Sequence, residues 1–294
     1  MTMENARIQT PPVPLLVDAH VHFHHCFDRD AFLDAALANF RRGAEELGIA
    51  GSFLGCLLLA EMTGERALQR LRSGEAGKWR FEPTAEPSSL IARRSTDGER
   101  LLVIAGRQVR TREGLEILAL LSNEEFPDGL AFRDALARVR WSGAVPVLPW
   151  GFGKWWFYRG ALIEALLRRP EPKWLFLGDN GGRPQWGGAP PLLREAEKRG
   201  VHVLPGSDPL PLPEHAARAG SYGFLMQNGV EERHPAAELR RWLRDLTEQP
   251  PIFGGCQSLT RFCRDQLALR LRRRSRVPAP SPAGRPAAHS TWTR

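Results

Sequence analysis

The chain of 294 residues lacks several features that would assign it to a familiar class of protein. Its four cysteines form no Cys-x-x-Cys pair and no zinc-finger spacing, so we expect reduced thiols rather than a disulfide framework. No apolar run approaches the roughly 18 residues that a membrane span needs. Residues 1–14 contain no apolar segment of the kind found in secretory signals. We therefore expect a cytoplasmic protein without a membrane partner.

Several motifs of catalysis and nucleotide binding are also missing. The sequence has no Gly-x-Gly-x-x-Gly and no Walker A motif, which argues against the common nucleotide-binding folds. It has no Gly-x-Ser-x-Gly elbow and no Cys/His pair at a recognisable motif. Covalent nucleophilic catalysis is therefore not expected.

The composition is that of a globular protein with an unusual C-terminus. Hydrophobic residues make up 42% of the chain and charged residues 25%. Seven arginines and no acids fall within residues 270–294, which leaves only +1 of the net charge of +8 for the rest. This proline-rich segment predicts a disordered basic tail. Contact with nucleic acid is expected only weakly, through this tail.

Short apolar runs alternate with segments of helical spacing, which predicts an α/β fold. Residues 14–21 predict a strand, residues 30–47 a helix and residues 52–60 a second strand. Residues 79–121 interrupt this rhythm and predict an antiparallel β insertion. The alternation then returns, with strands predicted at 144–148, 174–177 and 201–204 and helices at 130–141, 159–169, 192–199, 236–246 and 259–274.

The first predicted strand ends in Asp18-Ala19-His20-Val21-His22. Residues two apart on a strand point to the same face, so His20 and His22 are placed to bind one ion. Imidazole is a common ligand of Zn, Mn and Fe, and Asp18 is placed to orient one of the rings. A histidine pair at the edge of a loop is the alternative interpretation.

The segment from Leu16 to His22 resembles the first motif of the polymerase and histidinol phosphatase (PHP) family, and Gly206-Ser207-Asp208 resembles its late Gly-Ser-Asp. The first motif is also similar to the His-x-His of amidohydrolases. The PHP resemblance implies a distorted TIM-like (β/α)7 barrel over residues 15–269, between an N-terminal arm (1–14) and the tail (270–294). It also implies a site for up to three metal ions and phosphoester hydrolysis.

Carried over by motif, His20 and His22 match the family's first ligand pair and Asp208 its late aspartate ligand. Glu61 and Glu116 stand where the family commonly has histidines, so the resemblance implies one or two ions of Zn, Mn or Fe. Asp208 and Glu61 are the candidate catalytic carboxylates. For Glu61 the alternative is a carboxylate at the start of a helix, and for Asp208 it is an Asx turn before Pro209.

Two loops after predicted strands are candidates for substrate binding. The first contains Asp179, Asn180 and Arg183, whose guanidinium is suited to phosphate or carboxylate, and its alternative is a glycine-rich turn. The second is the aromatic segment that begins at Trp150, in which Lys154 is placed to pair with an anion. A packed surface or a partner contact is the alternative for this segment.

These observations predict a metal-dependent hydrolase, with a phosphoesterase as the first hypothesis. Metal-bound water would be the nucleophile and the substrate a small, phosphorylated or otherwise anionic molecule. Two alternatives stay open: an amidohydrolase that cleaves C–N bonds, and a degenerate barrel that only binds a ligand or partner. The sequence does not distinguish oligomeric states.

Overall fold

The central strand of the molecule, β1 (Leu15–Val21), is buried along its entire length. A strand covered on both faces needs apolar side chains on both, and the run Leu15, Leu16, Val17 provides them. The structure is a computed structural model that describes residues 13–73, 77–169, 174–185 and 188–275.

Two mixed sheets make up the β structure. The larger sheet has the strand order β12-β11-β1-β2-β5-β4-β3. Only β1, β2 and β5 run parallel to one another in it, and the remaining neighbours are antiparallel. Its other strands are β2 (Leu54–Leu59), β3 (Trp79–Pro83), β4 (Ser89–Arg94), β5 (Arg100–Ile104), β11 (Tyr222–Met226) and β12 (Ile252–Gly254).

The smaller sheet has the order β10-β9-β8-β7-β6. Strands β8, β9 and β10 are parallel, whereas β6 and β7 join them antiparallel. The bounds are β6 (Gly106–Arg110), β7 (Glu116–Leu120), β8 (Val145–Pro149), β9 (Phe176–Asn180) and β10 (Val203–Gly206).

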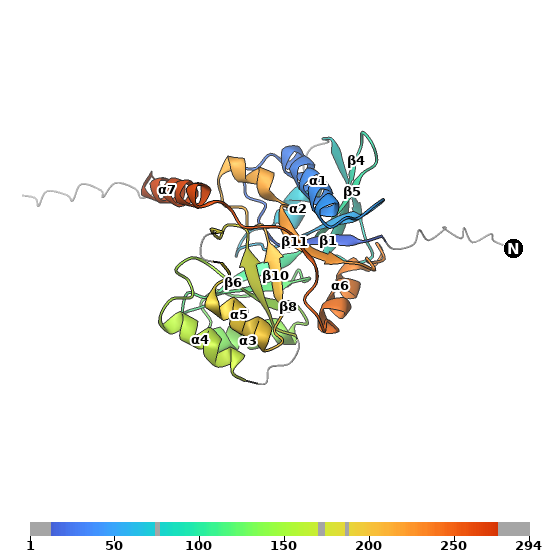
Figure 1. The fold of residues 1–294 in the computed structure, drawn as a ribbon. Helices are drawn as coiled ribbons and strands as arrows, with labels where there is room; N and C mark the ends of the chain where they lie inside the picture. The colour runs from blue at the N-terminus through green and yellow to red at the C-terminus, as the bar shows by residue number, and fades with distance from the viewer. Residues whose placement is uncertain (1–12, 74–76, 170–173, 186–187, 276–294) are drawn as a thin grey trace, which may run out of the picture.

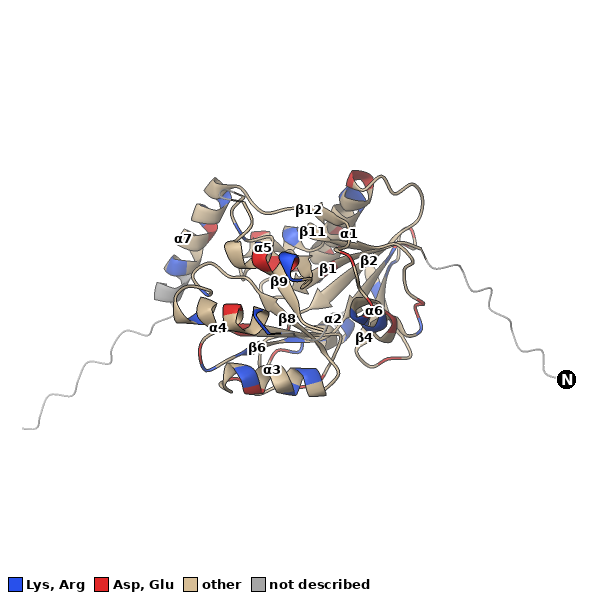
Figure 2. Ribbon diagram, turned by 60° about the horizontal axis from the view of Figure 1, so that its bottom comes forward, with Lys and Arg blue, Asp and Glu red and all other residues tan. Residues whose placement is uncertain are grey.

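Helices cover the outer face of each sheet, and an apolar core fills the space between the sheets (Figure 1). Buried side chains of α1 (Arg29–Glu46) and α2 (Ala67–Ser73) pack on the larger sheet. The smaller sheet is covered by α3 (Phe132–Trp141), α4 (Tyr158–Leu167) and α5 (Pro191–Lys198), as the turned view in Figure 2 also shows. Side chains of α6 (Pro235–Arg244) close one end of the core between the sheets.

The predicted (β/α)7 barrel is wrong. A closed barrel needs a continuous ring of paired strands, but here the strands form two separate sheets, and within the described residues the sheets are joined by isolated contacts such as the Glu61–Arg107 bridge and not by a strand ladder. The strands within residues 79–121, for which antiparallel pairing was expected, are divided between the two sheets, and β11 and β12, at which no strand was predicted, also pair antiparallel and need no crossover helix. In particular, β5 belongs to the larger sheet itself and not to a separate insertion.

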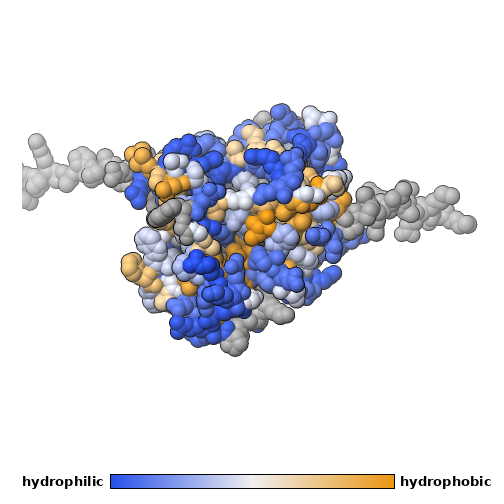
Figure 3. Space-filling model, in the orientation of Figure 1, coloured by the Kyte–Doolittle hydropathy of each residue, from blue (hydrophilic) through white to orange (hydrophobic). Residues whose placement is uncertain are grey.

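The C-terminal helix α7 (Leu259–Ser275) extends into the segment predicted to be a disordered tail, so that prediction is wrong for residues 270–275. The rest of the predicted tail, and residues 1–12 of the predicted arm, lie outside the described residues. Helix α7 projects from the body (Figure 1), and Leu267 and Leu271 are exposed on it. Figure 3 shows apolar surface where this helix lies. In the part of the chain that the structure describes, no helix is both long and apolar enough to span a bilayer.

The two sheets approach each other closely where Gly206 of β10 lies against His20 of β1. A Cβ atom added to Gly206 would lie 2.4 Å from the backbone nitrogen of His20 and 2.5 Å from its Cβ. Isolated hydrogen bonds cross this contact, among them Asp208 N–H to the carbonyl of His20 at 2.8 Å. Glycine is thus required here for close approach.

We expect Gly206→Ala to destabilise the protein, because the added methyl group forces β1 and β10 apart. Overpacking of this kind costs about 1–3 kcal/mol, which corresponds to a fall in melting temperature of roughly 3–10 °C. The matched control is Gly255→Ala, since nothing lies within 4 Å of a Cβ at that position. Equal melting temperatures of the two variants would show that this contact is not tight.

Candidate metal centre

The two histidines of the first motif converge at the end of β1. His20 and His22 are both buried, and their Nε2 atoms lie 3.1 Å apart. The rings meet edge to face, with centroids 5.0 Å apart. The predicted pairing on one side of the strand is therefore present in the structure.

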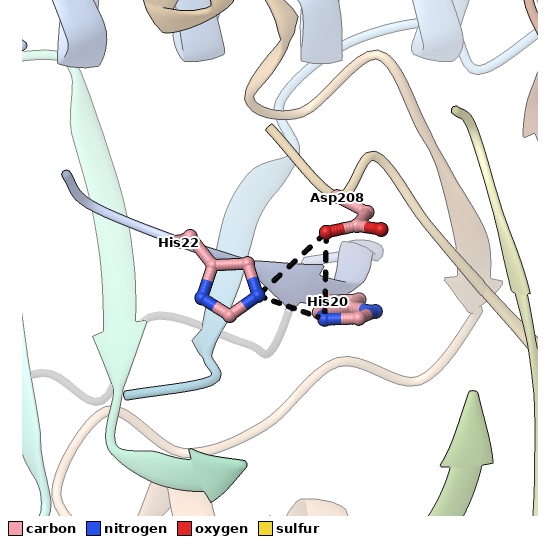
Figure 4. Close-up of side chains that lie close together, drawn as sticks. All are labelled: His20, His22 and Asp208. Carbon is pink, nitrogen blue, oxygen red and sulfur yellow. Dashed lines mark hydrogen bonds and ion pairs between the residues drawn. The ribbon is translucent and has the colours of Figure 1, made fainter. Parts of the chain in front are cut away.

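Asp208 brings a carboxylate to the same point from the loop after β10. Its Oδ1 lies 3.7 Å from His20 Nε2 and 3.6 Å from His22 Nε2 (Figure 4). The backbone of Asp208 has a φ of 45°, in the left-handed region that aspartate tolerates better than most residues. His20, His22 and Asp208, here called the metal triad, are a group of potential metal ligands whose binding atoms all lie within 4.8 Å of one another.

The spacing of the metal triad fits a single ion. Two ligand atoms that each lie about 2.1 Å from a tetrahedral ion are roughly 3.4 Å apart, and the three separations here are 3.1, 3.6 and 3.7 Å. Three protein ligands leave a fourth position open, which is the arrangement of catalytic rather than structural zinc sites.

The protonation states of the metal triad also suit a metal ion. Burial, and after it the nearby His20, lower the pKa of His22 to about 3, so His22 is neutral at physiological pH and keeps a lone pair for a metal. Burial tends to raise the pKa of Asp208, but the electrostatic effects of the His20 and His22 rings and of the Lys154 ammonium outweigh it and hold that pKa below its usual value. The carboxylate is therefore ionised.

Asp18 organises the backbone around the metal triad. Its buried carboxylate accepts hydrogen bonds from the backbone N–H groups of His20 at 3.2 Å, Ser207 at 2.8 Å and Gly220 at 2.8 Å. Burial raises the pKa of Asp18 to about 7, against the opposing effect of these hydrogen bonds. The prediction that Asp18 orients a histidine ring gains no support, since the contacts of its carboxylate are to the backbone.

Asn180 of β9 holds the other oxygen of Asp208. Its Nδ2 donates to Asp208 Oδ2 at 2.7 Å and to the carbonyl of Trp150 at 3.0 Å. A ligand carboxylate fixed in this way keeps Oδ1 turned toward the two histidines. The structure thus places Asn180 against the metal triad and not in a separate loop for an anion.

A cavity of about 320 Å³ opens beside the metal triad. Its lining combines the two ligands His22 and Asp208 with the apolar side chains of Met62, Leu210 and Leu269. This size and mixed lining are typical of sites for small molecules. The full lining is His22, His24, Met62, Gln108, Glu116, Lys154, Asp208, Pro209, Leu210, Pro211 and Leu269.

Glu116 and Lys154 lie on the wall of this cavity as a pair. Lys154 Nζ contacts Glu116 Oε2, and the ammonium side chain is 42% exposed whereas Glu116 is 15% exposed. Glu116 is therefore brought to the cavity but not into the metal triad. Lys154 remains accessible to a second anion.

Glu61 is buried, and both of its carboxylate oxygens already have partners. Oε1 accepts the backbone N–H of Leu68 at 2.9 Å, in the first turn of α2, and Oε2 pairs with Arg107. The structure does not bring Glu61 into the metal triad or into the lining of the cavity. Its contacts correspond to the alternative interpretation, a carboxylate at the start of a helix.

Arg183 and Asp179 are paired with each other rather than directed toward the cavity. Arg183 donates from Nε and Nη2 to the two oxygens of Asp179, each at 2.8 Å, and from Nη1 to the carbonyl of Gly188. These hydrogen bonds raise the pKa of Arg183, and Tyr222 donates a further bond to Asp179. Trp150 packs against the apolar cluster between the smaller sheet and the helices that cover it. It does not line the cavity.

His24 and Leu269 are among the residues that line the cavity and were not predicted as site residues. His24 stacks on His22 with ring centroids 5.3 Å apart and contacts the carbonyl of Pro209 at 2.9 Å through Nε2. It lies two residues beyond the predicted ligand pair, and this spacing was an available signal. Leu269 comes from α7. Nothing in the sequence around it indicates that it lies near the Gly206-Ser207-Asp208 motif, which is about 60 residues earlier in the chain.

A buried contact anchors α7 near the cavity. Asp265 of α7 is 1% exposed, and its Oδ2 lies 3.1 Å from Nε2 of the fully buried His215. The other ring nitrogen of His215 accepts the backbone N–H of Leu210, which itself lines the cavity. Phe262 of α7 also packs against Phe152, with ring centroids 5.1 Å apart.

Comparison with known proteins does not identify the family of this chain. No family model matches it, and no curated protein matches its sequence. Among solved structures, it is similar to PsfC from Pseudomonas syringae PB-5123, with a TM-score of 0.45, 14% identity and coverage of 90% of this chain and 99% of that one. At these values the likeness indicates neither the family nor the chemistry of the chain.

We expect purified protein to bind about one equivalent of Zn, Mn or Fe, and the double variant His20→Ala/His22→Ala to bind none, because two of the three ligands are gone. Glu61→Gln should retain the metal, since Glu61 is bonded elsewhere. Elemental analysis of the dialysed proteins measures this. The control is His25→Ala, which removes an exposed histidine next to the motif. Loss of metal from Glu61→Gln but not from the double variant would contradict the assignment.

Proposed function

We propose that the protein is a metal-dependent hydrolase of small phosphoesters, with His20, His22 and Asp208 as the ligands of one divalent ion. The observation that carries the proposal is the spacing of these three ligands, two of which, His22 and Asp208, line a cavity of about 320 Å³. An ion bound there would lower the pKa of a water molecule and so supply hydroxide near neutral pH.

The residues of the chain have separate tasks in this proposal. Asn180 holds Asp208 in its binding orientation through the hydrogen bond to Oδ2. Lys154 binds the anionic end of the substrate, since its ammonium group is accessible in the same cavity. Leu269 and Met62 contact the organic part of the substrate and exclude water from it.

The resemblance to the PHP family, found in the two short motifs, supports the choice of phosphoesters over amides. The amidohydrolase alternative calls for a lysine that bridges metal ions, whereas Lys154 is paired with Glu116. The four cysteines are free, which is consistent with the cytoplasmic location that we include in the proposal.

A substrate screen tests this function. Protein loaded separately with Zn, Mn and Fe is assayed against a panel of phosphomonoesters and phosphodiesters and a panel of cyclic amides. We expect turnover of at least one phosphoester, lost in His20→Ala/His22→Ala and retained in His25→Ala. Turnover that persists in the double variant, or that is confined to the amides, would refute the proposal.

Lys154→Gln should raise KM for the phosphoester found in this screen by about tenfold, with a smaller effect on kcat. The lost interaction is a charge-assisted hydrogen bond worth roughly 1.5 kcal/mol. The variant also leaves Glu116 without its partner, so a carboxylate would then repel the anion. Lys198→Gln, which changes the same charge on the exposed side of α5, is the matched control. An unchanged KM would exclude Lys154 from substrate binding.

A further inference from the structure

A second concave site lies at the opposite ends of the parallel strands, between α3 and α6. It is a cavity of about 330 Å³ with Val145, Pro146 and Phe176 from the starts of β8 and β9 in its lining. The metal triad lies beyond the other ends of these strands, about 15 Å away at the rise of a β-strand. The two sites are therefore distinct.

The polar lining of this cavity is entirely cationic among the described residues. Arg140 of α3 and Arg244 of α6 line it, and no carboxylate does. Arg244 makes only a long contact of 3.4 Å, from Nη2 to the carbonyl of Gly143, and neither arginine forms an ion pair with a described residue. Lysine and arginine positions, blue in Figure 2, occur on both helices. The site is thus complementary to an anion.

An aromatic ring adds a second recognition element. The guanidinium of Arg140 stacks over the indole of Trp174, with Cζ 4.4 Å from the ring centroid, and the exposed Arg140 leaves its outer face open. Guanidinium groups stack on planar rings from either side, so a planar ligand placed on that face would extend the stack. The Nε1–H of Trp174 is buried and has no acceptor among the described residues.

A neighbouring cavity of about 210 Å³ shares Arg140 and Trp174 and adds two more arginines, Arg133 and Arg169. Trp141 also lines it and is 83% exposed. No carboxylate lines this cavity within the described residues. The two cavities, here called the arginine groove, therefore repeat the same combination of guanidinium and indole side by side.

We propose that the arginine groove binds a nucleotide unit, with the base stacked on Arg140 and the phosphate paired with Arg244. Repeated stacking groups interleaved with arginines are the elements that bind bases and phosphates without sequence preference. The ligand is either a free nucleotide or one unit of a single-stranded nucleic acid, and the second cavity would hold the next unit. This proposal does not depend on the metal site.

Isothermal titration of the full chain with adenosine monophosphate tests the proposal. We expect saturable binding, with adenosine and inorganic phosphate each bound about tenfold or more weakly, because each lacks one of the two recognised groups. Arg140→Gln should weaken binding of the nucleotide at least about tenfold. Arg138→Gln, an exposed arginine of the same helix that lines neither cavity, should leave binding unchanged.

A dinucleotide distinguishes the two sources of the ligand. If the dinucleotide binds about tenfold more tightly than the mononucleotide, the natural ligand is a nucleic-acid strand. If the two bind with equal affinity, the natural ligand is a free nucleotide. Absence of saturable binding at millimolar nucleotide overturns the proposal. The proposal is also overturned if Arg138→Gln loses as much affinity for the nucleotide as Arg140→Gln does, or if inorganic phosphate binds as tightly as the nucleotide. Melting temperatures verify that both variants are folded.

Discussion

The arrangement of the candidate site depends on one buried carboxylate. Asp18 lies in the middle of β1, where water is excluded, and it bonds to N–H groups from three separate parts of the chain. A buried carboxylate that lost these partners would be strongly unfavourable, so the three segments are held where the partners are available. They include the segment that carries His20 and the one that leads from Ser207 into Asp208. The metal triad thus inherits its geometry from a group that binds no metal.

The site combines rigid and adjustable parts. His20 and His22 are fixed by a central strand, and Asp208 is fixed by Asn180 and by the backbone contact to His20. The side chains farther into the cavity are of another kind, since Lys154 is partly exposed and Leu269 belongs to a helix that projects from the body. Ligand positions held by the sheet and a wall supplied by a separate helix are typical of sites in which one scaffold accommodates different substrates.

The sequence predicted the local features of the site better than its assembly. The histidine pair and Asp208 were predictable because each stands in a short motif whose spacing has a direct geometric meaning. The positions of Glu61 and Arg183 were not predictable. Glu61 pairs with Arg107 through tertiary packing, and Arg183 pairs with Asp179 through the geometry of its loop, and residue types alone reveal neither contact. Most strands were predicted near their observed positions, but periodicity carries no information about strand direction. The barrel came from the resemblance to the PHP family, and it is wrong because the strands form two separate mixed sheets.

The position of α7 has a consequence for the order in which the molecule is made. The ribosome releases β1 and its histidines first, and the loop with Asp208 follows almost 190 residues later. Helix α7 emerges after both, and only then can Asp265 contact His215 and Leu269 complete the cavity wall. A nascent chain can therefore assemble the metal triad before it has a closed pocket. The wall of the cavity is therefore completed only after all three residues of the metal triad have been synthesised.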